Sequence, residues 1–537
     1  MSVCLSAMLC SYAQTTIKGK VVDASNNQLL AGATISIEGN SVATTGKEGE
    51  FYIDCSKTKR IAISFVGYEA AQYTIKNCKD DFTVALTPYS QSLNNVEIAA
   101  TSSQNKALIN QPAAITQLNS VEIKRGTGLF LDDAINSNAP GVTMARRTVS
   151  AGQQFNIRGY GNGVRGTNGI SSNFDGQGYK MYLNGIPITD AEGITLMDDI
   201  DFGSIGSVEI LKGPSGTLYG SAIAGVVYLK TIRPAAGKTS IGQEVILGSC
   251  GLKRFTTSFN MGTERSSLLV NYGYQESDGY MTHTASAKRF FNAAGEFTIN
   301  EKQSISAYLG HSNSYDQRGG ELTIAQYLNN DYSGNSAYIK NDAHSEVLSF
   351  RGGISHHYKF NGSISNTTNL FGTGLATNAS SAGGWTDKNP INYGVRSVVD
   401  TRFHVGNRAT LSGTTGIEAQ TQFAETIGYT MGTNPGNPAG SNIILATRSN
   451  QYTKTNTWSL FSEWTLALQR DFSVSAGVGY NSMKIGLNDR IYAAGKPSNY
   501  SVKYNDMVSP HVAINKVFSK QFSLYVSYSQ AYKAPVS

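Results

Sequence analysis

The chain has 537 residues, a length that predicts two or three domains. Its net charge of +6 is spread along the sequence without a block of lysines and arginines, which excludes a basic nucleic-acid-binding tract. No run of about 18 apolar residues occurs, so a helical membrane protein is excluded, because a spanning helix needs about 20. A transmembrane β-barrel is not excluded, because only every second residue of a barrel strand faces lipid.

The N-terminal segment 1–13 is short and apolar and ends in the small-x-small sequence Ser11-Tyr12-Ala13. This pattern predicts the back half of a secretory signal peptide, whose basic leading region is missing. Lipidation of Cys10 is the alternative, although the bulky residues before it fit a lipid-attachment motif poorly. None of the later cysteines lies in a C-x-x-C motif, so neither a zinc nor a redox site is predicted. Cys55 and Cys78 either form a disulfide or remain free thiols.

Residues 16–86 consist of short stretches that alternate apolar and polar residues and are separated by turn-forming sequences. Several such strands in a short region predict a small β-sandwich. The region contains no histidine and no metalloprotease motif, so it offers no catalytic set. Four of its sequences are Ile17–Asp23, Leu30–Ile35, Thr45–Phe51 and Phe65–Tyr68. In these the region resembles the carboxypeptidase regulatory-like domain, a resemblance that implies a fold and not a peptidase activity.

Residues 87–114 form a polar linker rich in serine, asparagine and glutamine, with a short alternating segment at 93–101. An isolated segment of this kind is too short to bury its apolar side chains by itself. It is suited to pairing with the sheet edge of a partner, where main-chain hydrogen bonds supply the affinity. A plain linker strand is the alternative.

Residues 115–234 combine one predicted helix, 121–136, with several strands and glycine-rich turns, which indicates a mixed α/β domain. The sequence 161–166 spells G-x-G-x-x-G, but the residues after it do not favour the helix that a dinucleotide site requires. No nucleotide, metal or other cofactor is therefore predicted. The predicted strands are 153–159, 180–187 and 205–214.

Three segments of this domain carry a specific pattern: Asn156–Gly159, Tyr182–Pro187 and Val208–Gly220. They occur in the order found in the plug domain of TonB-dependent receptors, and the domain resembles that plug. The residues that carry the resemblance are Arg158, Gly159, Asn184, Gly185, Lys212, Gly213, Pro214 and Gly220. The resemblance implies a TonB box in the preceding linker, formed by Val96, Glu97, Ile98, Ala99, Ala100 and Thr101. Glu97 and Ala99 depart from the commonest box, so its limits stay open.

The insertion between the first two plug segments lies, by the same resemblance, at the apex of the plug, where a ligand would bind. Each of its residues could equally be a surface-loop residue without a ligand role. The candidate ligand-binding residues are Arg165, Asn168, Phe174, Asp175 and Tyr179.

Residues 238–537 repeat amphipathic stretches of roughly ten residues, the length of a barrel strand. In one of them Trp458 and Leu460 share one face, whereas Ser459 and Glu463 share the other. Predicted short turns alternate with predicted long polar loops, which indicates a transmembrane β-barrel with periplasmic turns and extracellular loops. The turns are 263–265, 300–302, 361–362, 406–408, 469–471 and 519–520; the loops are 276–288, 312–344, 378–390, 424–451 and 484–508.

The barrel pattern gives about 13 strands. Bacterial single-chain barrels have an even number of strands, and the resemblance implies 22, so we expect a C-terminally truncated sequence that lacks about nine strands. The predicted fold class is thus mainly β, with an N-terminal β-sandwich, a mixed α/β plug and part of an antiparallel transmembrane β-barrel.

The resemblance implies an outer-membrane receptor that takes up a scarce ligand with energy transmitted by TonB from the inner membrane. The plug and barrel sequences look most like those of ferric-siderophore receptors. Heme, a vitamin cofactor and oligosaccharides are the alternative ligands; His283, His311 and His344 form no clear heme-binding motif. A surface adhesin that transports nothing is an alternative of a different class.

No nucleophile motif such as G-x-S-x-G occurs, so the chain is not predicted to be an enzyme. The expected partners are TonB, a ferric siderophore or similar small ligand, and outer-membrane lipid. The receptor is expected to act as a monomer and to bind no nucleic acid.

Overall fold

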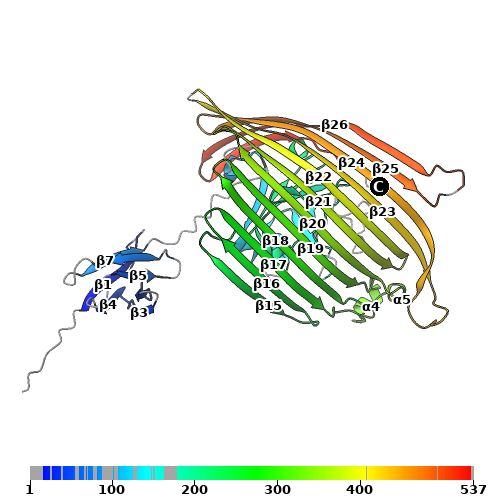
Figure 1. Cartoon of the computed structure of the whole chain (residues 1–537), viewed down its shortest axis with the longest axis horizontal. Helices are drawn as coiled ribbons and strands as arrows, with labels where there is room; N and C mark the ends of the chain where they lie inside the picture. The colour runs from blue at the N-terminus through cyan, green and yellow to red at the C-terminus, as the bar shows by residue number, and fades with distance from the viewer. Residues whose placement is uncertain are drawn as a thin grey trace, which may run out of the picture. The chain divides into compact units, whose positions relative to one another are not determined.

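In the computed structural model the chain divides into two units, Met1–Glu97 and Ile98–Ser537 (Figure 1). The described residues are 16–24, 27–37, 40–54, 60–65, 68, 70–75, 81–86, 101, 107–124, 130–146, 148, 152–161, 178–406, 408–492 and 494–533. Among them, no helix is both long and apolar enough to cross a lipid bilayer.

The first unit is a small β-sandwich, as the alternating sequence predicts. One sheet has the order β4-β1-β7 and the other the order β3-β2-β5-β6. Residues that alternate along these strands, among them Val21, Ile35 and Ile63, form its buried core. Cys55 and Cys78 lie outside the described residues. The strands are β1 (Thr16–Asp23), β2 (Thr34–Ile37), β3 (Asn40–Thr44), β4 (Glu50–Asp54), β5 (Arg60–Ser64), β6 (Ala71–Thr74) and β7 (Phe82–Leu86).

The second unit begins with the predicted mixed α/β domain, called the plug below. Its main sheet has the order β12-β11-β14-β13-β8, in which only β11 and β14 run parallel. Apolar side chains such as Met181, Val208 and Leu229 are completely buried around it. The elements are η1 (Leu108–Asn110), β8 (Ala114–Asn119), α1 (Ser120–Ile123), α2 (Leu131–Asn138), β9 (Val142–Ala145), β10 (Gln154–Ile157), β11 (Tyr179–Leu183), β12 (Ile186–Pro187), η2 (Phe202–Ser204), β13 (Ile205–Lys212), α3 (Gly216–Tyr219) and β14 (Gly225–Thr231).

The single helix predicted for residues 121–136 is wrong, because two helices occupy this stretch. The side chain of Asn119 accepts hydrogen bonds from the first N–H groups of α1, which ends at Ile123. Phe130 has an extended backbone (φ −142°, ψ 154°) directly before α2 begins. The sequence between the helices contains Gly126 and Gly128, which disfavour a helix interior and signal the break that the prediction overlooked.

Thirteen antiparallel strands, β15 to β27, then form one sheet in chain order, called the barrel sheet below. This confirms the predicted number of strands. Figure 1 shows them as long, tilted, neighbouring strands, coloured from green to red. The elements are β15 (Thr239–Leu247), β16 (Lys253–Gly262), β17 (Ser266–Ser277), β18 (Ser286–Asn300), β19 (Gln303–Gln317), α4 (Ile324–Leu328), α5 (Ser336–Lys340), β20 (His344–Lys359), β21 (Ile364–Ser381), β22 (Gly384–Val405), β23 (Ala409–Gly432), β24 (Ile443–Leu468), β25 (Phe472–Asp489), β26 (Asn499–Ser519) and β27 (Phe522–Ser529).

Successive residues of these strands alternate between a lumen face, which packs against the plug, and an outward face. On β24, Phe461 and Glu463 are 3% and 6% exposed on the lumen face, whereas Leu460 is 47% exposed on the outward face. The alternation predicted from the sequence of β24 is therefore confirmed.

Short turns join the strands at one end of the sheet, at the places that the sequence predicts. At the other end the predicted loop 378–390 is wrong, because β21 and β22 leave only residues 382 and 383 between them. The predicted loops 424–451 and 484–508 shrink similarly, to residues 433–442 and 490–498. The extensions of β21 and β22 are mostly polar, and a pattern without alternation is easily read as a loop. The extensions of β25 and β26 keep an alternation, with Ile485 and Leu487 opposite Val502 and Tyr500, that the prediction overlooked.

Candidate functional site: contacts between the plug and the barrel sheet

The turn after β10 brings Arg158 to the edge of the plug. Arg158 and Gly159 both have positive φ angles, 53° and 90°, so the second position suits glycine. The N–H of Gly159 donates to Asn156 Oδ1 (2.9 Å), which closes the turn. A Cβ atom at Gly213 would be 3.5 Å from Arg158 Nη1, so the guanidinium lies beside the turn that follows β13.

The hairpin between β11 and β12 is closed by Asn184 and Gly185, whose φ angles are 50° and 84°. Two left-handed residues of this type form the turn that suits the twist of paired strands. The Asn184 side chain donates to Thr231 Oγ1 and accepts from the Thr231 N–H, both at 3.0 Å. These hydrogen bonds fasten the hairpin to β14.

Lys212 ends β13, and its ammonium group donates to Thr116 Oγ1 on β8 and to the carbonyl of Pro140, both at 3.0 Å. Burial, with the Arg158 charge as a second cause, lowers the pKa of Lys212. Gly213, with a φ of 114°, and Pro214 follow directly and lead the chain from β13 to α3. Lys212 therefore ties the edge strand β8 to the strand beside it.

The short helix α3 docks directly on the barrel sheet. Thr217 Oγ1 donates to the carbonyl of Ser509 on β26 at 2.8 Å. A Cβ atom at Gly216 would be 2.6 Å from Ser509 Oγ, and one at Gly220 would be 2.9 Å from Asn481 Oδ1. Both glycines are thus required by the close approach of the plug to the barrel sheet, a reason that the sequence did not reveal.

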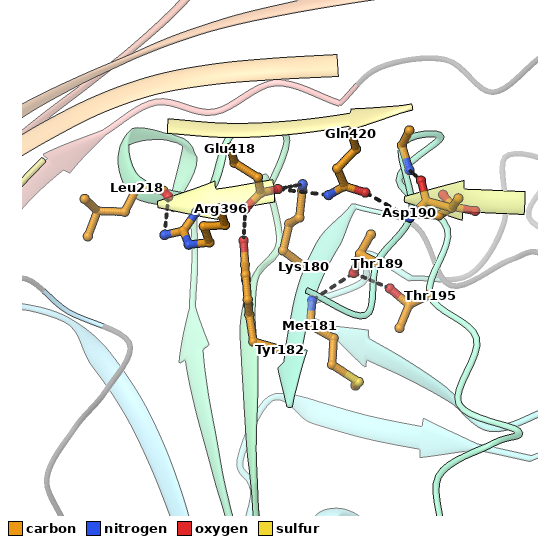
Figure 2. Close-up of polar contacts among 12 residues, drawn as sticks. Lys180, Met181, Tyr182, Thr189, Asp190, Thr195, Leu218, Arg396, Glu418 and Gln420 are labelled. Carbon is orange, nitrogen blue, oxygen red and sulfur yellow. Dashed lines mark hydrogen bonds and ion pairs between the residues drawn. The ribbon is translucent and has the colours of Figure 1, made fainter. Parts of the chain in front are cut away.

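A buried carboxylate, Glu418 on β23, is the centre of the contacts in Figure 2. From the plug it accepts hydrogen bonds from Lys180 Nζ and the Tyr182 hydroxyl, both at 2.9 Å. From the barrel sheet it accepts from Arg396 Nη1 (2.8 Å) and Gln420 Nε2 (3.0 Å). Burial, followed by the charge of Glu418, holds the pKa of Tyr182 well above its ordinary value, so the hydroxyl remains a donor.

Arg396 links the same group to α3. Its Nη2 donates to the carbonyl of Leu218 at 3.2 Å, and its guanidinium lies over the rings of Tyr182 and Tyr219, 5.2 Å from each centroid. Two strands of the barrel sheet and two elements of the plug are therefore joined by one network of charges.

A second network joins the plug to β16 and β20. Asp199 accepts two hydrogen bonds from Arg351, at 2.7 and 3.1 Å, and Arg351 is only 2% exposed. Asp201 accepts from Arg254 at 2.6 Å. Two-point carboxylate–guanidinium pairs are strong and fix orientation as well as distance.

A third contact involves Asp190 and Glu192 in the loop after β12. Asp190 Oδ1 accepts from the N–H groups of Glu192 and Ile194, both at 2.9 Å. Burial, and next the carboxylate of Glu192, raise the pKa of Asp190 to about 7. Lys388 of the barrel sheet lies 3.7 Å from Glu192 and partly balances this negative charge.

A cavity of about 380 Å³ separates the plug from β24 to β27. Arg158, Lys212, Glu463 and His511 line it, and the His511 ring contacts Glu463 Oε2 at 2.8 Å. Thr101 also lines the cavity, at the end of the barrel sheet with the short turns.

That position of Thr101 follows from its neighbours. Its hydroxyl donates to Gln111 Oε1 (2.5 Å), just after η1. Asn515, close to the short turn after β26, donates to the carbonyl of Ile109 in η1 (3.4 Å).

The predicted ligand-binding and TonB-box residues are described only in part. Val96 to Ala100 lie outside the described residues, as do Arg165, Asn168, Phe174 and Asp175. Tyr179 begins β11 and is 1% exposed; its ring packs against Phe155 (5.9 Å between centroids) and its hydroxyl accepts from the Phe155 N–H (3.4 Å). Its side chain thus faces the plug interior rather than a ligand at the apex, because β11 is buried along its whole length.

Sequence reasoning missed the charged residues of the networks, which are far apart in the chain. The available signal was a set of charges at lumen positions of the barrel strands, such as Arg351, Arg396 and Glu418. Within the described residues no group of three or more histidine, cysteine, aspartate or glutamate side chains is arranged to hold a metal ion.

Comparison with known families agrees with this architecture. Residues 107–227 match the family described as TonB-dependent Receptor Plug Domain. Residues 254–537, more than half of the chain, match the family described as TonB dependent receptor-like, beta-barrel. The chain belongs to the TonB-dependent receptors. Residues 17–98 of this receptor match the CarboxypepD_reg-like domain, which confirms the resemblance of the N-terminal sandwich.

Similar proteins and structures include several members of this family. The vitamin B12 transporter BtuB of Vibrio vulnificus (strain CMCP6) is 26% identical over 208 residues, which are 38% of this chain and 30% of that protein. The unliganded ferric citrate transporter FecA superposes with a TM-score of 0.65 at 14% identity, covering 78% of this chain and 63% of that one. The siderophore receptor PiuA from Acinetobacter baumannii gives 0.62 at 14% identity, with 79% and 65% covered.

The chain spans less than two thirds of the length of these relatives. At 14% identity the structural matches demonstrate the fold: a plug that packs against the lumen face of an antiparallel barrel sheet.

Proposed function

We propose that this receptor lies in the outer membrane, acts as a monomer and takes up a scarce ligand with energy supplied through TonB. The observation that carries the proposal is the location of Thr101, the last residue of the predicted TonB box. It lies at the short-turn end of the barrel sheet, which faces the periplasm in outer-membrane barrels. In this proposal the segment that precedes Thr101 meets its partner on the periplasmic side.

In this proposal TonB pairs a strand with the segment Val96–Thr101, and main-chain hydrogen bonds provide the affinity. A pull on this segment passes through η1 to β8, which lies at the edge of the plug sheet. In the described part of the chain β8 pairs with β13 alone, from Ala114 opposite Lys212 to Asn119 opposite Ser207. The pull therefore opens this ladder from the Ala114 end, one pair after another, beside the cavity lined by Lys212.

For the ligand we infer a ferric siderophore. The folds of the ferric citrate transporter FecA and the siderophore receptor PiuA support this choice, together with the plug sequence. The sequence match to the vitamin B12 transporter BtuB favours a corrinoid as the second candidate.

The test is growth of a deletion strain of the source organism, complemented with the full-length gene. We expect growth on ferric siderophores as sole iron source to need the gene and to be lost when Val96–Thr101 is deleted. A second box variant replaces the same residues by a flexible glycine-serine segment of equal length. It keeps the reach of the linker but removes the strand-forming sequence, so it should also lose growth. Growth that depends on the gene only when vitamin B12 is limiting would instead support the corrinoid; uptake that survives both box variants would contradict the TonB coupling.

A further inference from the structure

A band of apolar side chains covers the outward face of β24, β25 and β26 next to the short turns. The band ends where Trp458 on β24 meets Tyr480 on β25, with ring centroids 5.3 Å apart. Tryptophan and tyrosine mark the level at which the hydrocarbon core of a membrane gives way to headgroups. The outward side chains of the band include Leu460, Trp464, Leu466, Val474, Val478, Val508, Val512 and Ile514.

Three lysines lie just beyond this aromatic boundary on the same face, and we call Lys454, Lys484 and Lys503 the lysine triad. They come from three neighbouring strands, β24, β25 and β26. Lys484 and Lys503 are directly opposite each other in the ladder, and Lys484 faces Asn456, two residues from Lys454. All three side chains are exposed.

The height of the triad matches the headgroup layer. Lys454 is separated from Trp458 by about 13 Å along the strand, at about 3.3 Å per residue. With a strand tilt of roughly 40°, this corresponds to about 10 Å above the aromatic boundary. The polar layer of a membrane leaflet has a similar thickness, about 5–8 Å on each side of the hydrocarbon core, so long lysine side chains reach it.

Within the described residues no carboxylate forms an ion pair with the triad; Glu425 pairs with Arg490, and Asp506 accepts from the Tyr480 hydroxyl (2.8 Å). Like charges directly opposite each other in an antiparallel pair are destabilising. An anion between Lys484 and Lys503 would relieve this repulsion.

Aromatic rings continue the surface beside the triad. Tyr393, Phe423 and Tyr452 form a row across β22, β23 and β24, with successive centroids 6.3 Å apart. Lys454 lies 5.1 Å from the centre of the Phe423 ring. Such a row offers an amphipathic platform next to the charges, suited to a molecule with both an apolar part and a polar headgroup.

We propose that the lysine triad binds the phosphate groups of an anionic lipid headgroup in the outer leaflet of the membrane. The inference rests on the proposed outer-membrane location of the receptor, but not on its ligand or its TonB coupling. The apolar band lies directly below the triad and places the lysines at the membrane surface. This location favours a lipid over a soluble phosphate compound.

The test is lipid binding to the purified full-length receptor in detergent, measured by native mass spectrometry with diphosphoryl lipid A as the probe. Each basic residue near an anionic membrane surface contributes about a factor of five in affinity, so K454Q/K484Q/K503Q should bind roughly 100-fold more weakly. Removing the phosphates from lipid A should weaken its binding to the wild type by at least as much as the triple substitution weakens the binding of diphosphoryl lipid A.

A matched control, K302Q/K359Q/K520Q, removes three exposed lysines at the short-turn end and should bind like the wild type. The variant K454R/K484R/K503R keeps the charges and should retain binding, which separates loss of the site from loss of folding. Equal binding by the triad and control variants, or by phosphorylated and dephosphorylated lipid, would overturn the proposal. Because the assay involves neither transport nor TonB, its failure would leave the proposed uptake function untouched.

Discussion

Replacing Glu418 by glutamine should loosen the plug in the barrel without unfolding the barrel. The carboxylate accepts hydrogen bonds from Lys180, Tyr182 and Arg396, and all four side chains are largely buried. The glutamine amide presents one acceptor oxygen and one donor group to these donors, so two buried cations lose their counter-charge. Removal of one partner of a buried ion pair costs about 3–5 kcal/mol.

Hydrogen exchange of the purified receptor measures this effect locally. At about 1.4 kcal/mol per tenfold, even the lower figure predicts roughly 100-fold faster exchange of the amides of β11 and α3 in E418Q. The control is T415V, which removes a hydroxyl contact with Ser462 on the outward face of the same strand. The double variant E418Q/K180M should recover part of the loss, since it removes one of the two uncompensated charges. Exchange in E418Q no faster than in T415V would refute the idea that this carboxylate holds the plug.

Two further predictions concern other contacts of the plug. G216V should prevent α3 from docking, because a Cβ atom would lie 2.6 Å from Ser509 Oγ, and the plug should become sensitive to protease while the barrel stays resistant. The comparison for an added side chain is G374V on β21, where a Cβ atom would have no neighbour within 4 Å and φ is not positive. Burial and the carboxylate of Glu192 raise the pKa of Asp190 from 3.8 to about 7, so the folded plug favours the protonated form of this side chain. Its contribution to plug stability is full below about pH 4 and is lost as the pH rises through about 7. The free energy of unfolding measured in urea should therefore fall for the wild type relative to D190N as the pH rises between these values. A difference between the two proteins that does not change with pH would contradict the assignment.

The outcome of the sequence predictions depended on the range of the interactions involved. Alternation with a period of two is a local property of each strand, so Trp458 and Ser459 were correctly assigned to opposite faces. The loop predicted at 378–390 failed for the opposite reason. There β21 and β22 are long polar strands, held by pairs such as Ser380 with Trp385 that no single segment specifies.

The sequence by itself determined the order of domains, the strand pairing between neighbours and the turn residues with left-handed angles, because these depend on short-range geometry. Asn184-Gly185 is an example, since its φ angles of 50° and 84° suit few other residue pairs. Only the tertiary structure decided which charges meet. Asp199 and Arg351 are 152 positions apart, and Lys180 and Glu418 are 238 apart. Their contact follows from the way the plug fits the lumen face of the barrel sheet, which depends on all the strands together and leaves no local pattern in the chain.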